Sequence, residues 1–346
     1  MARIESVDTF RFIAISAVIA IHTSPFGVSI NEGPGNALSF MRLNTLVDLL
    51  ARFGVPYFFV ISGYFWGIKI RNGACPNTVS KRAIKKLLIL FLVWSAVYIP
   101  FFDVGSFAEY GLIGPLKTAY WHLLDLLNDP ATFIFQGTKG HLWFLVGLLC
   151  SIAIATPFVK KRKMNALVAL SIGLYLIGLS AKAYSASPLG ISLDFNTRNG
   201  PFFGTLFFVS GYLLSGLQPT QLWLKRGLLI AAFGYLMHFS ELYYLWKWYG
   251  TDPHQDYVFG TYFVGIGAAV ASLSNHPSLI KSGLGRIGQL TLGIYAIHYI
   301  FIDLLRPLGK QAIPLWDLWY FMLVLGLSVL SVVILAKKRV IKEMVQ

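Results

Sequence analysis

The sequence RFIAISAVIAIH, residues 11–22, places ten uncharged and mostly apolar residues between an arginine and a histidine. Such a run is typical of a helix that lies in hydrocarbon. A charged side chain at that depth costs about 2.5–3.5 kcal/mol, so its presence points to a function. Arg11 and His22 are eleven residues apart, which is close to three helical turns. They are therefore expected on one helix face, about 16 Å apart along the axis.

Plainer interpretations of these two residues stay open. The Arg11 side chain can extend to the cytoplasmic headgroups, and His22 can form an ordinary hydrogen bond between helices. Asp8 lies one turn before Arg11, where it can cap the helix and form an ion pair with the arginine. The shared helix face of Arg11 and His22 favours a joint role.

The composition extends this interpretation to the whole chain. Of 346 residues, 56% are hydrophobic and only 13% are charged, whereas soluble domains are about 25% charged. We therefore predict an all-α, polytopic membrane protein with about ten transmembrane helices, folded as a single domain over residues 1–346. The predicted spans are 9–26, 46–68, 85–102, 142–159, 164–181, 201–217, 226–245, 257–273, 287–304 and 315–336.

The net charge of +14 has a topological explanation. With the N-terminus in the cytoplasm, about two thirds of the 29 lysines and arginines fall on the cytoplasmic side of these spans. Both termini are therefore expected to be cytoplasmic, and the expected partner is a lipid bilayer rather than nucleic acid. The two cysteines, Cys75 and Cys150, show no spacing typical of a metal site or a disulfide framework.

Further candidate residues lie inside predicted spans or at their ends. His298 falls deep in the ninth span with Tyr295 one turn before it, and His141 opens the fourth span beside Trp143. Trp143 is equally typical of an aromatic belt at the membrane interface. Arg52, one turn after Asp48, is either half of a structural ion pair or a ligand-binding cation.

Basic residues gather at the cytoplasmic start of the third span, where Arg82, Lys85 and Lys86 share a helix. They are either a cradle for phosphates or charges that set the topology and contact anionic lipid. GLGRIG, residues 283–288, matches the glycine pattern of a dinucleotide site, but no strand precedes it, which excludes that fold. Arg286 at this helix start remains a candidate phosphate ligand.

Two other segments carry structural predictions. LKTAYWHLLDLLND, residues 116–129, has apolar residues at helical spacing and is expected to lie flat in the membrane interface. YFFVISGYFWG (57–67) resembles LFFVSGYLLSG (206–216). This similarity reflects either a duplication or a shared use of small residues where helices approach closely.

Taken together, the motifs resemble those of the acyltransferase-3 family of integral membrane O-acyltransferases. They are DTFRFIAISAVIAIH (8–22), RFGVPYFFVISGY (52–64), HLWFL (141–145) and LGRIGQLTLGIYAIH (284–298), in this order. The resemblance covers most of the chain. It implies acyl transfer from cytoplasmic acetyl-CoA to a hydroxyl of a cell-surface polysaccharide or lipid-linked sugar, at the cell inner membrane and without a metal.

The resemblance also suggests roles for the candidate residues. His22, Arg11 and His298 are the expected catalytic residues, with His22 either a general base or a carrier of the acetyl group. Acetyl-CoA is expected to bind to basic residues, and the acceptor is expected to bind to residues near the outer side of the membrane. The donor set is Arg82, Lys85, Lys86 and Arg286, and the acceptor set is Arg52, His141, Trp143 and Tyr295.

This chain departs from the family pattern at one pair of basic residues. The family commonly has an Arg-x-x-Arg pair after the second span, whereas this chain has Arg82 and Lys85, and lysine lacks the planar fork of arginine.

The alternative function is a transporter or flippase of lipid-linked sugars, in which intramembrane arginine and histidine would serve proton coupling.

Overall fold

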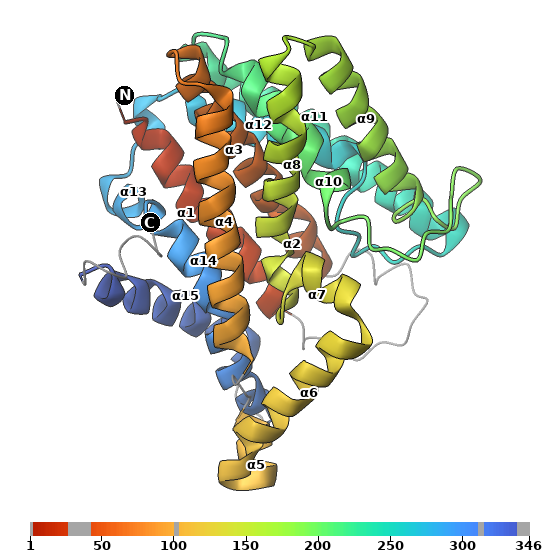
Figure 1. Cartoon of the computed structure of the whole chain (residues 1–346), viewed down its shortest axis with the longest axis vertical. Coiled ribbons are helices and arrows are strands. Elements are labelled where there is room, and N and C mark those ends of the chain that lie inside the picture. Colours follow the sequence, from red (N-terminus) through yellow and green to blue (C-terminus); the bar gives the residue numbers. More distant parts are fainter. Residues whose placement is uncertain (1–2, 27–42, 100–103, 311–314, 338–346) are drawn as a thin grey trace. The chain divides into compact units, whose positions relative to one another are not determined.

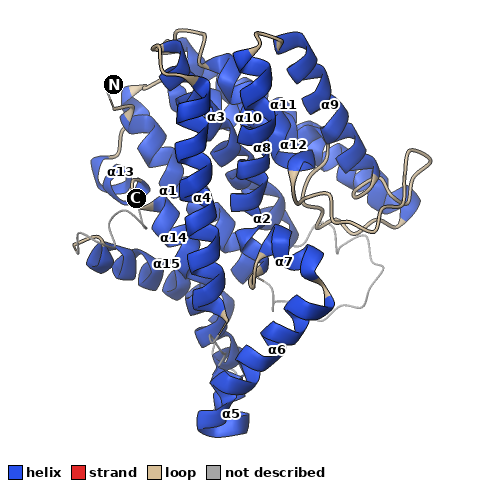
Figure 2. Ribbon diagram, viewed as in Figure 1, coloured by secondary structure: helices blue, strands red, loops and turns tan. Residues whose placement is uncertain are grey.

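The computed structural model describes residues 3–26, 43–99, 104–310 and 315–337. Within these ranges all regular structure is helical and there is no strand (Figure 2). Most of the predicted outer loop at 27–45 and most of the basic C-terminal tail lie outside the described residues. The all-helical class predicted from the sequence is confirmed.

Each of the ten predicted spans coincides with a helix or a helix pair (Figure 1). These helices are α1 (Glu5–Thr23), α2 (Leu43–Ala51) with α3 (Gly54–Arg71), α4 (Pro76–Tyr98), α8 (Trp143–Lys160), α9 (Met164–Ser180), α10 (Pro201–Leu214), α11 (Leu222–Tyr249), α12 (Phe259–Leu273), α14 (Thr291–Leu305) and α15 (Trp316–Leu335). In the described part, six segments are long and apolar enough to cross a membrane, and three further apolar helices are shorter. The count of ten spans and the cytoplasmic termini stay predictions.

The remaining helices are short or amphipathic. They are α5 (Val104–Tyr110), α6 (Gly114–Asn128), α7 (Pro130–Gln136) and α13 (Ser282–Gly288), with 3-10 turns η2 (Gly111–Ile113), η3 (Gly140–Leu142), η4 (Pro277–Leu279) and η5 (Arg306–Lys310). The predicted helix at 116–129 is α6. Its Leu116, Tyr120, Leu123 and Leu127 recur at helical spacing and are exposed. This apolar stripe favours a position in the membrane interface, which stays a prediction.

The chain divides into two compact units, each assembled from three separated segments. The first unit comprises Met1–Val7, Arg52–Ile89 and Trp143–Ile280, and the second comprises Asp8–Ala51, Leu90–Leu142 and Lys281–Gln346. Because the segments alternate along the sequence, no single cut of the chain separates the units. The prediction of one domain over 1–346 stays a prediction.

In the first unit, the two similar sequence segments pack against each other as α3 and α10. A β-carbon at Gly63 would collide with the backbone carbonyl of Phe208, and one at Gly211 would collide with the backbone carbonyl of Val60. The glycines thus let the two backbones touch, which supports the packing explanation of the similarity.

Gly211→Ala is expected to destabilise the protein by about 1–3 kcal/mol, because the added methyl group meets backbone that cannot rotate away. Gly173→Ala in α9 is the matched control, since nothing lies within 4 Å of a β-carbon there. Thermal unfolding of both variants in detergent measures the difference. Equal unfolding temperatures for the two variants would contradict this account of the α3–α10 contact.

In the second unit, two tyrosines fix α14 by its backbone. The hydroxyl of Tyr98, from the end of α4, donates to the carbonyl of Ala296 at 2.7 Å. The hydroxyl of Tyr320, from α15, donates to the carbonyl of Ile302 at 2.9 Å. Both tyrosines are buried. Because these bonds hold the backbone of α14 at two points along its length, the side chains that α14 carries have a defined position.

Candidate active site

Three histidines from distant parts of the sequence meet in the second unit. His22 lies near the end of α1, His141 lies in η3, and His298 lies in α14. The ring centroids of His22 and His298 are 5.7 Å apart, and those of His141 and His298 are 5.1 Å apart. We call His22, His141 and His298 the imidazole cluster. Sequence analysis selected each of them separately, two as catalytic and His141 as acceptor-binding.

Tyr299 joins the imidazole cluster and was not predicted. Its hydroxyl oxygen lies 3.1 Å from Nδ1 of His22. Its ring stacks on His141 with centroids 4.4 Å apart and planes only 10° apart. The predicted Tyr295 also belongs to this site, because its hydroxyl donates to the backbone carbonyl of His141. Two adjacent turns of α14 thus position the rings of His22 and His141.

The hydrogen bonds of His298 define where its proton lies. Its Nδ1 is 2.7 Å from the backbone carbonyl oxygen of Tyr295. A carbonyl oxygen only accepts, so Nδ1 carries the hydrogen and Nε2 of the neutral ring carries a lone pair. That Nε2 is buried and has no hydrogen-bond partner among the described residues. His298 is therefore oriented as a base within the cluster.

Exposure distinguishes the three rings. His298 is 0% exposed and His141 is 3% exposed, whereas His22 is only half-buried. A neutral imidazole carries one nitrogen lone pair, so the half-buried His22 ring, which Tyr299 contacts through Nδ1, can act as a base. His22 is consequently the member of the cluster that a substrate reaches most easily.

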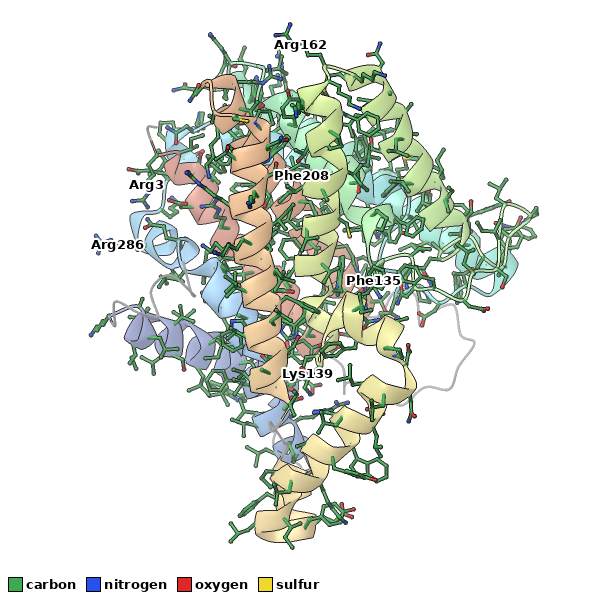
Figure 3. All side chains as sticks on the ribbon, in the orientation of Figure 1. Arg3, Phe135, Lys139, Arg162, Phe208 and Arg286 are labelled. Atoms are coloured by element: carbon green, nitrogen blue, oxygen red, sulfur yellow. The ribbon has the colours of Figure 1, made fainter. Side chains whose placement is uncertain are left out.

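An ion pair ties together the two segments that carry the buried histidines. Nζ of Lys139 lies 2.6 Å from Oδ2 of Asp303, and the two side chains are 21% and 12% exposed. Lys139 (Figure 3) precedes His141 by two residues, and Asp303 follows His298 in the same helix. Sequence analysis did not predict this pair, because its members are far apart in the chain.

The beginning of α1 carries Arg11, the other predicted catalytic residue. Arg11 forms the expected ion pair with Asp8, with Nη1 3.0 Å from Oδ1. One continuous helix connects Arg11 with His22, so the shared face expected from their spacing is retained.

The short helix α13 packs against the same end of α1. A β-carbon at Gly288 would collide with the carbonyl of Asp8, and the backbone nitrogen of Lys281 donates to the Thr9 hydroxyl at 3.2 Å. Arg286 projects from α13 and is exposed (Figure 3). The predicted residues Arg11 and Arg286 thus lie on two packed helices of the second unit.

The other predicted donor-binding residues belong to the first unit. Arg82, Lys85 and Lys86 are exposed on the first half of α4. The GLGRIG segment forms the short helix α13 and no strand precedes it among the described residues, in agreement with the exclusion of a dinucleotide fold. That all four basic residues hold one acetyl-CoA stays a prediction.

The predicted acceptor residues divide between the units. His141 and Tyr295 belong to the imidazole cluster and its surroundings, whereas Arg52 and Trp143 belong to the first unit. Arg52 forms an ion pair with Asp256, with Nη1 3.3 Å from Oδ1. The guanidinium of Arg198 lies over the Trp143 ring, 5.1 Å from its centroid. Sequence analysis gave Arg198 and Asp256 no role.

A cavity of about 370 Å³ lies in the second unit, and Gly140, the residue before His141, is one of its lining residues. Its lining combines carboxylates, amides, hydroxyls and the ring of Phe133. The lining residues include His122, Asp125, Asn128, Asp129, Thr132, Gln136 and Thr138. Groups of this kind suit a ligand that is rich in hydroxyls.

Tyr299→Phe is expected to lower about tenfold the kcat of a reaction in which His22 acts, and to leave KM unchanged. The variant removes one hydrogen bond to His22 but keeps the ring that stacks on His141. Tyr120→Phe, on the exposed face of α6, is the matched control. An unchanged kcat in Tyr299→Phe would show that the hydroxyl does not position His22.

Comparison with protein families gives one match that covers nearly the whole chain. A family model described as an acyltransferase domain matches residues 4–337. The match includes both compact units and every member of the imidazole cluster. No solved structure is significantly similar to the chain.

Three curated relatives match part of the chain. An amino-acid racemase of Enterococcus faecalis is 33% identical over 60% of this chain and 28% of its own length. A second amino-acid racemase of that organism is 26% identical over 65% of this chain and 29% of its own length. A serine/alanine racemase of Enterococcus gallinarum is 27% identical over 69% of this chain and 33% of its own length. The chain thus spans about a third of the length of these relatives.

Proposed function

Since the chain belongs to the acyltransferase-3 family, we propose that it is a membrane O-acetyltransferase that uses acetyl-CoA. The acceptor is a hydroxyl of a cell-surface polysaccharide or of a lipid-linked sugar. Six helices with the length and apolar character of membrane spans support a multi-pass membrane protein, and we place it in the cell inner membrane. The motifs also resemble those of the O-acetyltransferase of enterobacterial common antigen, a narrower resemblance that stays a prediction.

The observation that carries this proposal is the imidazole cluster. Esterification of a sugar hydroxyl is assisted by a base in its unprotonated form, because a hydroxyl is a weak nucleophile until its proton is removed. His22 supplies that base at a half-buried position, and Tyr299 orients its ring. His298 lies beside it with a second lone pair.

In the proposed reaction, the neutral imidazole of His22 removes the proton of the acceptor hydroxyl while the oxygen attacks the thioester carbonyl of acetyl-CoA. The tetrahedral intermediate then collapses, the carbon–sulfur bond breaks, and the CoA thiolate leaves. The imidazolium of His22 returns its proton to the thiolate. The products are the acetyl ester and free CoA, and His22 is again neutral.

A covalent route uses the same residue. The imidazole of His22 would attack the thioester carbonyl and expel the CoA thiolate as the carbon–sulfur bond breaks. The sugar oxygen would then attack the acetyl group on the imidazole, the carbon–nitrogen bond would break, and the hydroxyl proton would pass to the thiolate, which restores neutral His22 and gives free CoA. Incubation of the protein with radiolabelled acetyl-CoA and no acceptor distinguishes the two routes. Label that stays on the protein supports the covalent route, and its absence supports direct transfer.

Acetyl-CoA is proposed to enter from the cytoplasm with its phosphates on basic residues. Exposed basic groups on α4 in the first unit, and the exposed guanidinium of Arg286 on α13 in the second unit, are each complementary in charge to a phosphate. Arg11 would receive the donor on the face of α1 that leads to His22. The acceptor is proposed to approach from the outer side, and the carboxylate, amide and hydroxyl groups that line the cavity of the second unit support a hydroxyl-rich ligand.

A transporter or flippase of lipid-linked sugars is the second candidate. Its support is the group of ionisable side chains in candidate spans, which include the imidazole cluster and Asp303. Movement of a lipid-linked sugar across proteoliposomes without any acyl donor would favour it. The racemase activities belong to relatives of which the matched segments make up only 28% and 33%, so we do not transfer them to this chain.

The test of acyl transfer has two parts. Surface glycans from cells with and without the gene are compared by mass spectrometry, and loss of one acetyl group per repeat is expected without it. The purified full chain in nanodiscs, supplied with acetyl-CoA and that glycan, is then expected to release CoA. Glycans identical in the two strains, together with no CoA release, would contradict the proposed function.

A further inference from the structure

The cavity of the second unit is lined by α6, α7 and the segment that follows α7 (Figure 1). Nδ1 of His122, in α6, lies 2.9 Å from the carbonyl oxygen of Ile99. The hydroxyl of Thr138, after α7, donates to the carbonyl of Ser95 at 2.7 Å. Because Ser95 and Ile99 are one turn apart at the C-terminal end of α4, both walls of the cavity are attached to the same support. The cavity is therefore held open by the fold.

The side chains of the lining offer more hydrogen-bond acceptors than donors. A carbonyl oxygen only accepts, so Nδ1 of His122 carries the hydrogen and Nε2 of the neutral ring keeps a lone pair. The Thr138 hydroxyl donates its hydrogen to a backbone carbonyl, and its oxygen still accepts. The amides of Asn128 and Gln136 offer both kinds of group, whereas the carboxylates only accept. A ligand of this cavity is therefore expected to bring hydrogen-bond donors, such as hydroxyl or ammonium groups.

Two carboxylates make the lining negative. Asp125, in α6, and Asp129, between α6 and α7, line the cavity, and neither forms an ion pair with a described residue. Hydrogen bonds from Thr132 lower the pKa of Asp129, so this carboxylate is ionised at neutral pH. Among the described residues of the lining, only His122 can carry a positive charge. With both aspartates ionised, the net charge of the lining is negative in either state of the imidazole.

The lysine closest to the lining in the sequence does not neutralise this charge. Lys139 lies between Thr138 and Gly140, which both line the cavity. Its Nζ, however, is 2.6 Å from Oδ2 of Asp303 in α14. The ammonium group of Lys139 is thus engaged with a carboxylate that is not part of the lining.

The lining also contains an aromatic ring. Phe133 lines the cavity, and Phe91 of α4 lies beside it, with ring centroids 6.4 Å apart. An aromatic face packs against the apolar face of a pyranose ring and attracts a cation. The volume of about 370 Å³ lies at the lower end of the range for ligand pockets. These features suit a small ligand, such as one sugar unit.

We propose that the cavity of the second unit binds an amino sugar of the acceptor, with the ammonium group on Asp125 and the sugar ring on Phe133, and that it discriminates against acidic sugars. The assignment of this sugar to the acceptor rests on the proposed function. It is supported by position, because the cavity and the imidazole cluster belong to the same unit, and Gly140 of the lining directly precedes His141. A site for a divalent cation and a cavity that holds only solvent are the competing outcomes of the test.

Three methyl glycosides are suitable probes, because two of them differ from methyl glucoside in one group. Methyl glucosaminide has an amine in place of a hydroxyl, and methyl glucuronide has a carboxylate in place of the hydroxymethyl group. Their dissociation constants are measured by ligand-observed NMR on the purified full chain in phosphatidylcholine nanodiscs, at about pH 6.5, where the amine is protonated. The wild-type protein is expected to bind the glucosaminide about tenfold more tightly than the glucuronide, with the glucoside between them.

The variants separate the two contacts. Asp125→Asn is expected to abolish the preference for the glucosaminide over the glucoside and to leave glucoside binding unchanged, because the amide keeps the shape and loses the charge. Phe133→Leu is expected to weaken the binding of all three sugars alike. Asp194→Asn removes the same charge from an exposed loop of the first unit, and this control should change none of the constants. Asp129 is left unchanged because its side chain caps α7.

The competing outcomes give different results. Equal dissociation constants for the three sugars in the wild-type protein, or no binding of any of them, would overturn the proposal. The titration is repeated with calcium chloride to test the cation alternative, because carboxylate, amide and hydroxyl oxygens are also ligands of Ca²⁺. Loss of the glucosaminide preference on that addition, together with its retention in EDTA only, would assign the cavity to a metal ion. Asp125 is exposed, so Asp125→Asn is expected to unfold at the wild-type temperature, and it decides alone if Phe133→Leu does not fold.

The same preparation separates failure of this inference from failure of the proposed function. Acetyl transfer at equal KM to acceptors with and without an amino sugar, with no preference among the three probes, would refute the amino-sugar site and leave the transferase intact. A glucosaminide preference that depends on Asp125, without any acetyl transfer, would leave the site intact and refute the transferase.

Discussion

His22→Ala is expected to lower acetyl transfer by about 10²–10⁴-fold, the usual contribution of a positioned general base. His22 is the most accessible ring of the imidazole cluster, and the remaining rings, His141 and His298, are buried beneath the surface. They cannot replace a lone pair that has to meet the acceptor hydroxyl. The rate of CoA release in the presence of the acceptor glycan is the measurement.

The matched control is His254→Ala, which removes an exposed loop histidine whose Nδ1 lies 3.0 Å from Asp252. Both variants should unfold at the wild-type temperature in detergent, so that the loss in His22→Ala is a loss of chemistry. Full activity in folded His22→Ala would exclude His22 from the mechanism. It would also direct attention to His298, whose Nε2 is the other oriented lone pair.

The helices were predictable from the sequence because apolar runs and helical periodicity are local properties. Their ends were less predictable. The span expected at 85–102 is α4, which begins nine residues earlier at Pro76, because its first half is basic and hydropathy detects only the apolar half. The span expected at 287–304 begins at Thr291, because Ser282–Gly288 forms the separate helix α13.

The members of the imidazole cluster were predictable one at a time, but their meeting was not. A histidine in an apolar segment is conspicuous in a sequence, whereas its neighbours depend on how distant helices pack. Tyr299 was missed because a tyrosine in an apolar helix resembles any core or interfacial aromatic residue. No local pattern marks the one whose hydroxyl reaches His22.

The ion-pair partners of the basic residues were also not predictable from the sequence when they lie far away in the chain. Asp48, one turn away, was the carboxylate considered for Arg52, but Arg52 also reaches Asp256, 204 residues further along the chain. Periodicity predicts partners within a few helical turns. It carries no information about which loops meet in space, so the convergence of Lys182 and Arg198 on Asp256 required a structure.

Lys139→Met is expected to destabilise the protein by about 3 kcal/mol and to reduce acetyl transfer with it. The change leaves the carboxylate of Asp303 largely buried without the cation that lies 2.6 Å from it. Removal of one partner from a buried pair costs about 3–5 kcal/mol, and the partial exposure of this pair favours the lower value. Thermal unfolding in detergent measures the first effect, and CoA release measures the second.

The double variant Lys139→Met with Asp303→Leu is expected to recover most of the lost stability, because two apolar side chains of similar volume leave no unpaired charge. Lys161→Met, at an exposed position just after α8, is the control and should change stability by less than about 0.5 kcal/mol. The double variant should nevertheless remain less active than the wild-type protein, since the ion pair also joins the segment of His141 to the helix of His298. Wild-type stability in Lys139→Met would show that solvent already screens the pair, and the geometry of the imidazole cluster would then depend on the tyrosine hydrogen bonds alone.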